Sequence, residues 1–185
     1  MIKLKGNHVI LRDLTEQDVE VLYHRTYEAE DREYQKWNGP YFTIEPKTRE
    51  AFREQLQPRL DAVGTEETRR ALVIEADGKL IGQVSWYWVS EVTNWMEAGI
   101  VIMDSRYWSG GYGTEAFRMW VDYLFAHMDI VRLGLATWSG NERMIGLARK
   151  LGMIEEARIR KARIVDGEYY DSVKMGILRE EWEAL

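Results

Sequence analysis

Hydrophobic and polar residues follow a strand-like period in some segments and a helical period in others, so the sequence predicts most elements of the fold. The chain opens with a strand at residues 8–14 and a helix led by Thr15, because Glu16 and Asp18 occupy its first turn. An irregular, aromatic-rich loop over residues 31–46 precedes a second helix at about residues 47–62. The chain is therefore expected to begin with a strand followed by a helix.

The rest of the chain is richer in strands. Strand periodicity predicts a hairpin over residues 71–88 that turns at Asp77-Gly78, and a further strand over residues 95–103. A closing hairpin is expected over residues 159–174. Helical spacing predicts a helix led by a glycine run and one more at about residues 141–150, with a strand at residues 133–138 between them.

The order β-α-α-β-β-β-α-β-α-β-β predicts a mixed α/β fold. Its sheet should contain about seven mostly antiparallel strands, with one crossover around the glycine-led helix. A chain of 185 residues fits one domain over residues 1–185 and shows no repeat or interdomain linker.

Composition narrows the possible functions. The absence of cysteine excludes disulfides, cysteine metal sites and a thiol nucleophile, and favours the cytoplasm. No segment approaches the ~20 apolar residues of a membrane span, so no membrane partner is expected. The formal charge of −6 disfavours nucleic acid and mildly favours a cationic partner. The three histidines lack metal-ligand spacing, so no metal is expected.

The segment SRYWSGGYGTEA at residues 105–116 contains three glycines within four residues, between a strand and a helix. Unobstructed N–H groups and a helix N-terminus suit a phosphate or pyrophosphate, and the alternative is a tight turn that binds nothing. A dinucleotide fold expects an acid at the end of the next strand, where this chain has Ala136-Thr-Trp-Ser. The triphosphate loop expects Gly-Lys-Ser/Thr, which is absent. Among phosphate ligands, the remaining possibility is a cofactor whose pyrophosphate lies on this turn and whose ribose needs no acid on the next strand.

Three ordered motifs identify a resemblance. Residues 108–116 (WSGGYGTEA) resemble the pyrophosphate-binding motif of GNAT-superfamily acetyltransferases, and residues 141–153 (NERMIGLARKLGM) look like that family's Asn-led helix. Residues 152–182 are similar to the closing hairpin of the subgroup that includes ribosomal-protein N-terminal and spermidine acetyltransferases. The resemblance covers essentially the whole chain and implies a GNAT fold, a twisted, mostly antiparallel sheet with helices on both faces.

The resemblance also implies acetyl-CoA as cosubstrate, with its pyrophosphate on the amides of residues 109–114. A main-chain amide near Ile102 or Met103 would polarise the thioester carbonyl. Asn141 would contact the pantetheine arm, and helix capping is the alternative role for it. The implied cofactor-binding residues are Ile102, Met103, Trp108, Ser109, Gly110, Gly111, Tyr112, Gly113, Thr114, Asn141 and Arg149.

The expected nucleophile is an amine with a pKa near 10, so a base or a water chain should take its proton. Glu97 is the candidate base, and the alternative is a solvated glutamate on the opposite face of the strand. Many relatives have a tyrosine that protonates the departing thiolate at the position where this chain has Ala148. Tyr112 or Tyr170 could replace it, or no acid is used. Core packing is the alternative to an acceptor-binding role for five aromatic residues: Tyr34, Trp37, Tyr41, Trp86 and Trp88.

These motifs lead to one functional hypothesis with two alternatives. The chain is expected to transfer an acetyl group directly to a primary amine in a ternary complex, because it has no cysteine to carry the group. The acceptor would be a protein or peptide N-terminus or a polyamine-like molecule, and a homodimer is compatible with the hypothesis. The alternatives are a non-catalytic acetyl-CoA-binding or sensing module and a structural interaction protein that uses its tryptophans.

Overall fold

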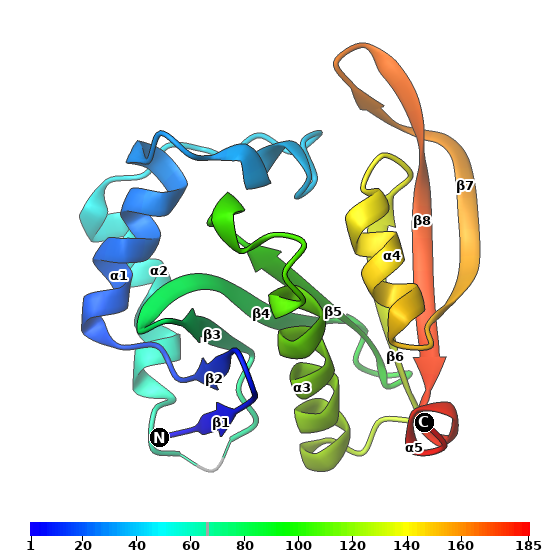
Figure 1. The fold of residues 1–185 in the computed structure, drawn as a ribbon, viewed down its shortest axis with the longest axis horizontal. Coiled ribbons are helices and arrows are strands. Elements are labelled where there is room, and N and C mark those ends of the chain that lie inside the picture. The colour runs from blue at the N-terminus through cyan, green and yellow to red at the C-terminus, as the bar shows by residue number, and fades with distance from the viewer. Residues whose placement is uncertain (66) are drawn as a thin grey trace.

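The computed structural model describes residues 1–65 and 67–185 and contains one eight-stranded sheet (Figure 1). The strand order across the sheet is β1-β2-β3-β4-β5-β6-β8-β7. The strands are β1 Lys3–Lys5, β2 Ile10–Arg12, β3 Ala71–Ala76, β4 Lys79–Ser90, β5 Trp95–Ile102, β6 Arg132–Trp138, β7 Ile154–Val165 and β8 Glu168–Leu178. The α-helices are α1 Glu16–Tyr23, α2 Arg49–Asp61, α3 Tyr112–His127, α4 Glu142–Lys150 and α5 Arg179–Glu183.

Three short helical segments complete the set. A π-helical segment, η1 (His24–Glu28), continues from α1, and 3-10 turns form at η2 (Glu33–Lys36) and η3 (Ser105–Tyr107). The η2 turn lies inside the stretch that the sequence predicts as an irregular loop. The η3 turn directly precedes the glycine run.

The pairing of the strands confirms the mixed α/β prediction. Every neighbouring pair is antiparallel except β5 and β6, which are parallel and joined through α3. The expected number of about seven strands is one short, because β1 pairs with β2 at the edge of the sheet. The single predicted crossover therefore lies at the glycine-led helix.

Helices cover both faces of the sheet. Phe117, Trp120 and Leu124 of α3 are fully buried in one core, which also contains buried residues of α4 and α5. A second core on the other face contains Leu22 of α1 and Phe52 of α2, together with residues of the central strands. The sheet thus has an α3–α4 face and an α1–α2 face.

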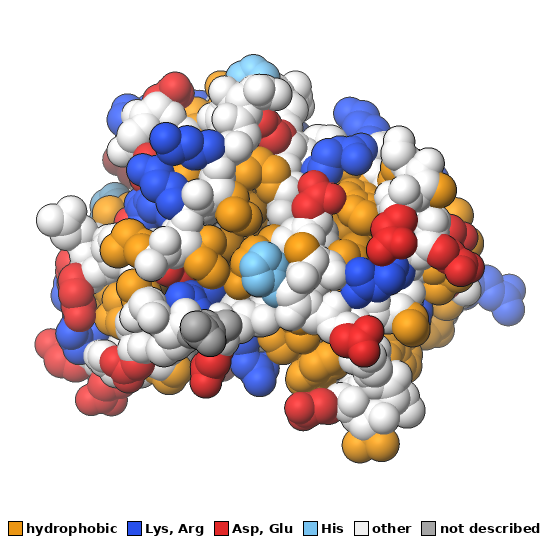
Figure 2. All heavy atoms as spheres, turned by 90° about the horizontal axis from the view of Figure 1, so that it is seen from below, with side chains coloured by type: hydrophobic (Ala, Val, Ile, Leu, Met, Phe, Trp, Pro, Cys, Tyr) orange, Lys and Arg blue, Asp and Glu red, His pale blue; other side chains and the backbone are white. Residues whose placement is uncertain are grey.

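The β7–β8 hairpin is longer than the sequence predicts and projects beyond the rest of the molecule (Figure 1). Its register shifts between Glu155 and Ala157 and again between Ile159 and Arg163. At the opposite end of the molecule, acidic and basic side chains are intermixed with hydrophobic ones (Figure 2). None of the helices in residues 1–65 and 67–185 is long and apolar enough to cross a membrane.

Candidate active site

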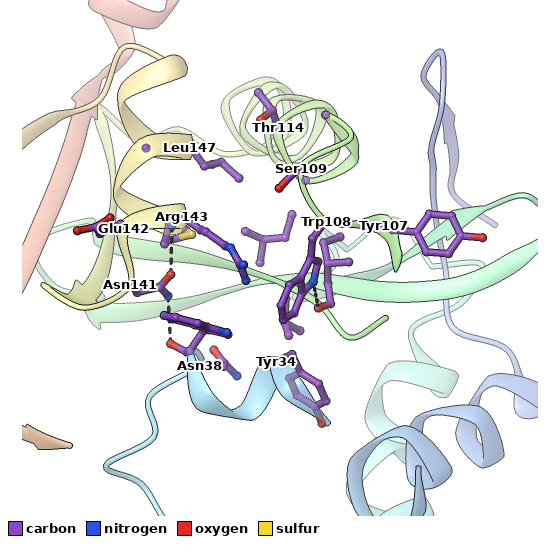
Figure 3. Close-up of a pocket in the computed structure, with 18 of the residues that line it drawn as sticks. Tyr34, Asn38, Tyr107, Trp108, Ser109, Thr114, Asn141, Glu142, Arg143 and Leu147 are labelled. Atoms are coloured by element: carbon purple, nitrogen blue, oxygen red, sulfur yellow. Dashed lines mark hydrogen bonds between the residues drawn. The ribbon is translucent and has the colours of Figure 1, made fainter. Parts of the chain in front are cut away.

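A cavity of about 410 Å³ lies beside the N-terminal turn of α3, where β5 leads into the glycine run (Figure 3). β5 and β6 share the register pair Glu97–Gly134, and the cavity is lined by the end of β5 beyond that pair. The glycine turn, one face of α4 and residues at η2 complete the lining. The structure brings together these residues singled out by the sequence: Tyr34, Trp37, Ile102, Trp108, Ser109, Gly111, Gly113, Thr114 and Asn141.

The glycine turn presents free main-chain amides at the start of α3. Ser109 and Gly111 have φ values of 62° and 85°, a left-handed conformation that turns the chain sharply into the helix. The first intrahelical hydrogen bond runs from Glu115 N to Gly111 O at 3.0 Å. The amides of residues 112–114 therefore have no intrahelical acceptor and lie at the positive end of the helix dipole. This arrangement suits a phosphate group.

Two glycines of the turn serve different purposes. A Cβ atom at Gly113 would lie 3.6 Å from Leu147 and 3.8 Å from Ile102, so a side chain there would enter the cavity. A Cβ atom at Gly110 would lie 2.7 Å from the ring of Tyr112. Gly113 keeps the cavity open, whereas Gly110, which is not in the lining, makes room for that ring.

The two candidate oxyanion amides differ in their availability. Met103 N donates to Ile81 O at 2.7 Å, so this amide is already used in pairing with β4. Because amides alternate between the two sides of a strand, the N–H of Ile102 points away from β4, toward the side on which β6 lies. Met103 is also buried at 3% exposure. The prediction of an oxyanion amide is therefore restricted to Ile102, and Met103 is corrected to a core residue.

Helix α4 contributes cations that the sequence analysis did not select. Arg143 and Lys150 line the cavity, and Arg143 extends toward Trp108 (Figure 3). The Arg143 guanidinium lies 4.3 Å from the ring centre of Trp108 and 5.0 Å from that of Trp37. Arg149, the predicted cofactor contact, instead lies 3.7 Å from Glu155 and is outside the cavity. Position 149 is on another face of the helix from the lining residues of α4, so the cavity gives the predicted cofactor contact of Arg149 no support.

Asn141 lines the cavity, as a cofactor contact would, and its side chain also caps a helix. Its Oδ1 atom accepts a hydrogen bond from Met144 N at 3.2 Å, which caps α4. Its Nδ2 atom donates to Trp37 O at 3.0 Å (Figure 3), and Trp138 Nε1 donates to the same oxygen at 3.0 Å. Asn141 thus links α4 to the segment after η2. The Trp37 indole nitrogen is itself buried without a partner among the described residues.

Glu97 lies on the α1–α2 face of the sheet in a buried polar cluster. The residue is 1% exposed, and its Oε1 atom accepts a hydrogen bond from Lys174 Nζ at 2.6 Å. The hydroxyl of Tyr87, the residue opposite Glu97 on β4, donates to Oε2. Partial burial and this hydrogen bond raise the pKa of Tyr87 above its ordinary value of 10, so the phenol stays a donor. The solvated-glutamate alternative is excluded.

The candidate acids lie elsewhere. The ring of Tyr112 packs edge-to-face against Tyr107 at 5.1 Å and against His8 at 6.0 Å, outside the cavity lining. Tyr170 packs against the ring of Trp138 at 4.8 Å, and Ala148 is fully buried. The proposed catalytic role of Tyr112 is therefore corrected to an aromatic packing role. The described structure brings none of these three residues to Glu97.

The five aromatic acceptor candidates separate into three groups. Tyr34 and Trp37 line the cavity. Tyr41 lies outside it, 4.7 Å from the guanidinium of Arg163. Trp86 and Trp88 are corrected to core residues, because they alternate with Tyr87 and so lie on the α3–α4 face, where Trp86 Nε1 donates to Arg69 O at 2.8 Å.

Sequence reasoning missed Lys174, Tyr87 and Arg143. Lys174 was detectable in principle, since Ser172, Lys174 and Gly176 alternate with the buried Val173, Met175 and Ile177 along β8. The hydrogen-bond partner of each polar side chain, in contrast, depends on strand register, which could not be predicted from the sequence. Among the residues that the structure describes, no cluster of three or more potential metal-ligating side chains occurs.

The fold provides a cavity between the end of β5, the N-terminus of α3 and α4, and the lining of this cavity suits a phosphate-bearing ligand. The family described as the Acetyltransferase (GNAT) domain matches residues 8–154. The chain therefore belongs to the GNAT acetyltransferase family, as its motifs predict, and is an N-acetyltransferase.

Individual relatives match over nearly the whole chain. Spermidine N(1)-acetyltransferase of Escherichia coli (strain K12) is 27% identical over 180 residues, covering 97% of this chain and 90% of the relative. YdaF of Bacillus subtilis (strain 168), named as a candidate ribosomal N-acetyltransferase, is 26% identical over 178 residues, covering 96% and 95%. The crystal structure of spermidine N-acetyltransferase from Vibrio cholerae in complex with CoA and spermine has a TM-score of 0.77 at 18% identity, covering 96% of this chain and 99% of that one.

Proposed function

We propose that this enzyme transfers the acetyl group of acetyl-CoA directly to a primary amine while both substrates are bound. The observation that carries the proposal is the turn at residues 109–114, whose free amides open onto the cavity beside Arg143 and Lys150. A helix N-terminus with free N–H groups and neighbouring cations stabilises an anionic diphosphate.

The pantetheine arm and thioester would lie along the end of β5, where Ile100 and Ile102 line the cavity. The free N–H of Ile102 would donate to the thioester oxygen as it gains negative charge in the tetrahedral intermediate. The indole N–H of Trp37 is a second unpartnered donor at this cavity. Neither group needs to gain or lose a proton at this step, because both act only as hydrogen-bond donors.

Glu97 is the proposed base for the acceptor amine. The carboxylate faces the α1–α2 side of the sheet, at the point where β5 and β6 are in register. Lys174 Nζ occupies Oε1 at 2.6 Å, so an acceptor ammonium would replace a cation that the protein already places there. Glu97 would then take a proton from the ammonium to produce the nucleophilic amine.

The leaving thiolate needs no dedicated acid. A thiol has a pKa near 8.5, so a CoA thiolate can depart and take its proton from solvent. This proposal agrees with the positions of Tyr112, Tyr170 and Ala148, none of which lines the cavity. The lack of cysteine also leaves direct transfer as the route, and keeps the cytoplasm as the proposed compartment.

The test is release of free CoA thiol from acetyl-CoA in the presence of peptides with free N-termini, polyamines and aminoglycosides. We expect turnover with at least one amine class and none with the corresponding N-acetylated compound. Absence of thiol release with every acceptor, combined with tight acetyl-CoA binding, would contradict the proposal and favour a cofactor-binding module. The named relatives are acetyltransferases and give that alternative no support.

A further inference from the structure

The strand β7 carries a dense group of cations. Arg158, Arg160, Lys161 and Arg163 lie within six residues on the hairpin that projects beyond the sheet (Figure 1). Lys161 has a left-handed φ of 52°, at the register shift between Ile159 and Arg163. The strand is thus locally irregular where its positive charge is greatest.

This group reaches the acceptor side of the candidate active site. Arg163 stacks over the ring of Tyr41 at 4.7 Å and is the register partner of Tyr170 on β8, the strand that carries Lys174 four residues further on. Lys174 Nζ donates to Glu97 Oε1 at 2.6 Å. Strand β8 therefore connects the proposed base to the basic strand, because it pairs with β7 and its Lys174 bonds to Glu97.

Among the described residues, Arg158 is the only one of these four cations that forms ion pairs. Arg158 pairs with Glu155 at 2.7 Å and with Asp171 at 3.3 Å. Among residues 1–65 and 67–185, no ion pair involves Arg160, Lys161 or Arg163. The Nε atom of Arg163 is buried without a partner in the same part of the chain. The β7–β8 hairpin as a whole carries equal numbers of basic and acidic side chains, so the positive charge is confined to the stretch from Arg158 to Arg163.

We infer that the preferred acceptor is a peptide whose free N-terminus is followed by acidic residues. This inference rests on the proposed function, since the terminal amine would bind at Glu97. An extended peptide advances about 3.3 Å per residue, so carboxylates in its first few residues can reach Arg163, Arg160 and Lys161. A polyamine would instead bring further positive charge toward these cations, which is unfavourable.

Three peptides that share the same first residue and length test this inference. Their next four residues are acidic (Glu and Asp), neutral (Gln and Asn) or basic (Lys and Arg), and spermidine is the fourth acceptor. We expect kcat/KM to be at least 10-fold higher for the acidic peptide than for the basic one, mainly through KM. The difference should shrink as salt rises from 50 to 500 mM, because the contacts are partly exposed.

Variants locate the effect on β7. Arg160→Glu and Arg163→Gln should each reduce the advantage of the acidic peptide about 10-fold, again through KM. Arg53→Gln is the matched control, because Arg53 is an exposed arginine of α2 that pairs with Glu16. Thermal melting of each variant separates a local charge effect from loss of the fold.

The outcomes distinguish the two proposals. Equal or faster turnover of the basic peptide or spermidine would overturn this inference and leave the acetyltransferase proposal intact. An acidic preference that survives both β7 substitutions would also overturn it. Failure of every acceptor to release CoA thiol would overturn the proposed function and this inference with it.

Discussion

At the scale of single residues, Glu97 is the side chain on which the proposed chemistry depends. Its two oxygens accept hydrogen bonds from Lys174 and Tyr87, so Glu97→Gln keeps the shape but removes the proton acceptor. General-base catalysis contributes about 100-fold or more, and we expect kcat to fall by at least that factor. Steady-state thiol release at saturating acetyl-CoA measures it.

Glu91→Gln is the control, since Glu91 is exposed in the turn between β4 and β5. It should leave the rate unchanged. CoA affinity, measured by calorimetry, should be the same in both variants, because neither residue lines the cavity. An undiminished kcat in Glu97→Gln would show that another group or a water chain takes the proton.

A second prediction at this scale concerns Gly113. An added methyl group would lie in ordinary contact with Leu147 and Ile102, at 3.6 and 3.8 Å, and would narrow the cavity. Alanine also favours a helix by up to about 1 kcal/mol over glycine. Gly113→Ala should therefore melt at the same or a higher temperature while its Kd for CoA rises about 10-fold. Unchanged affinity in the folded variant would contradict the placement of the diphosphate on this turn.

The residue scale also shows where sequence reasoning succeeds. Glycines report close approach directly, so the turn at residues 109–114 could be predicted as a ligand site from its composition. The sequence does not show which face of a helix a ligand would contact, so it does not identify the charged residues that line a site. Arg149 was selected and Arg143 was not, because the choice depends on which face of α4 meets the cavity, and packing decides that.

At the scale of elements, the connection between α4 and the segment after η2 can be tested through Asn141. Its Oδ1 atom caps α4, and its Nδ2 atom holds Trp37 O. Asn141→Asp keeps an acceptor for the cap but loses the donor, whereas Asn141→Ala loses both. We expect the alanine variant to be less stable by about 1 kcal/mol in urea unfolding, and the aspartate variant to be nearly unchanged.

Both variants should show faster amide hydrogen exchange in residues 33–46 than the wild type, because one of two side-chain donors to Trp37 O is lost. Exchange elsewhere, for example in α3, serves as the internal reference. Wild-type protection of residues 33–46 in both variants would mean that Trp138 alone holds this segment.

Elements with strong periodicity could be predicted, and those maintained by pairing could not. The three-residue strand β1 contains a single apolar residue, Leu4, and is held by its partner β2 and by hydrogen bonds between Ile2 and Asp13. A segment of three residues is too short for strand periodicity to predict it. The start of β7 was likewise missed, because its first residues are all exposed and lack alternation. The missed end of β8, in contrast, contains the buried Met175 and Ile177.

At the scale of the whole molecule, net charge and the charge near the proposed site favour different acceptors. The acidic total favours a cationic partner, whereas the cations of β7 favour the acidic peptide inferred above. The sum of charges is a property of the composition, whereas the local field depends on which strands the fold places beside Glu97. The order of elements, in contrast, predicted the crossover and the position of the cavity, because both follow from chain connectivity.

Asp104 connects distant parts of the molecule and gives it a defined response to acid. Its carboxylate is 1% exposed and accepts hydrogen bonds from Arg106 of η3 at 2.6 Å and from Arg25 of η1 at 2.8 Å. The bonds from Arg106 and then Arg25, against the opposing effect of burial, hold the pKa of Asp104 well below its ordinary value of 3.8. The unfolded chain therefore binds a proton more readily than the folded protein does.

The sign of the pH dependence follows from this difference. Ionised Asp104 stabilises the fold above pH 3.8, and its contribution is lost as the pH falls from there through the lower folded pKa. Asp104→Asn should lower the free energy of unfolding by about 2 kcal/mol at pH 7, less than a fully buried pair because Arg106 is exposed. The gap between variant and wild type should narrow between pH 4 and pH 2, measured by urea unfolding. Asp129→Asn, at an exposed loop position, should match the wild type throughout, and a gap that stays constant with pH would refute the assignment of this acid response to Asp104.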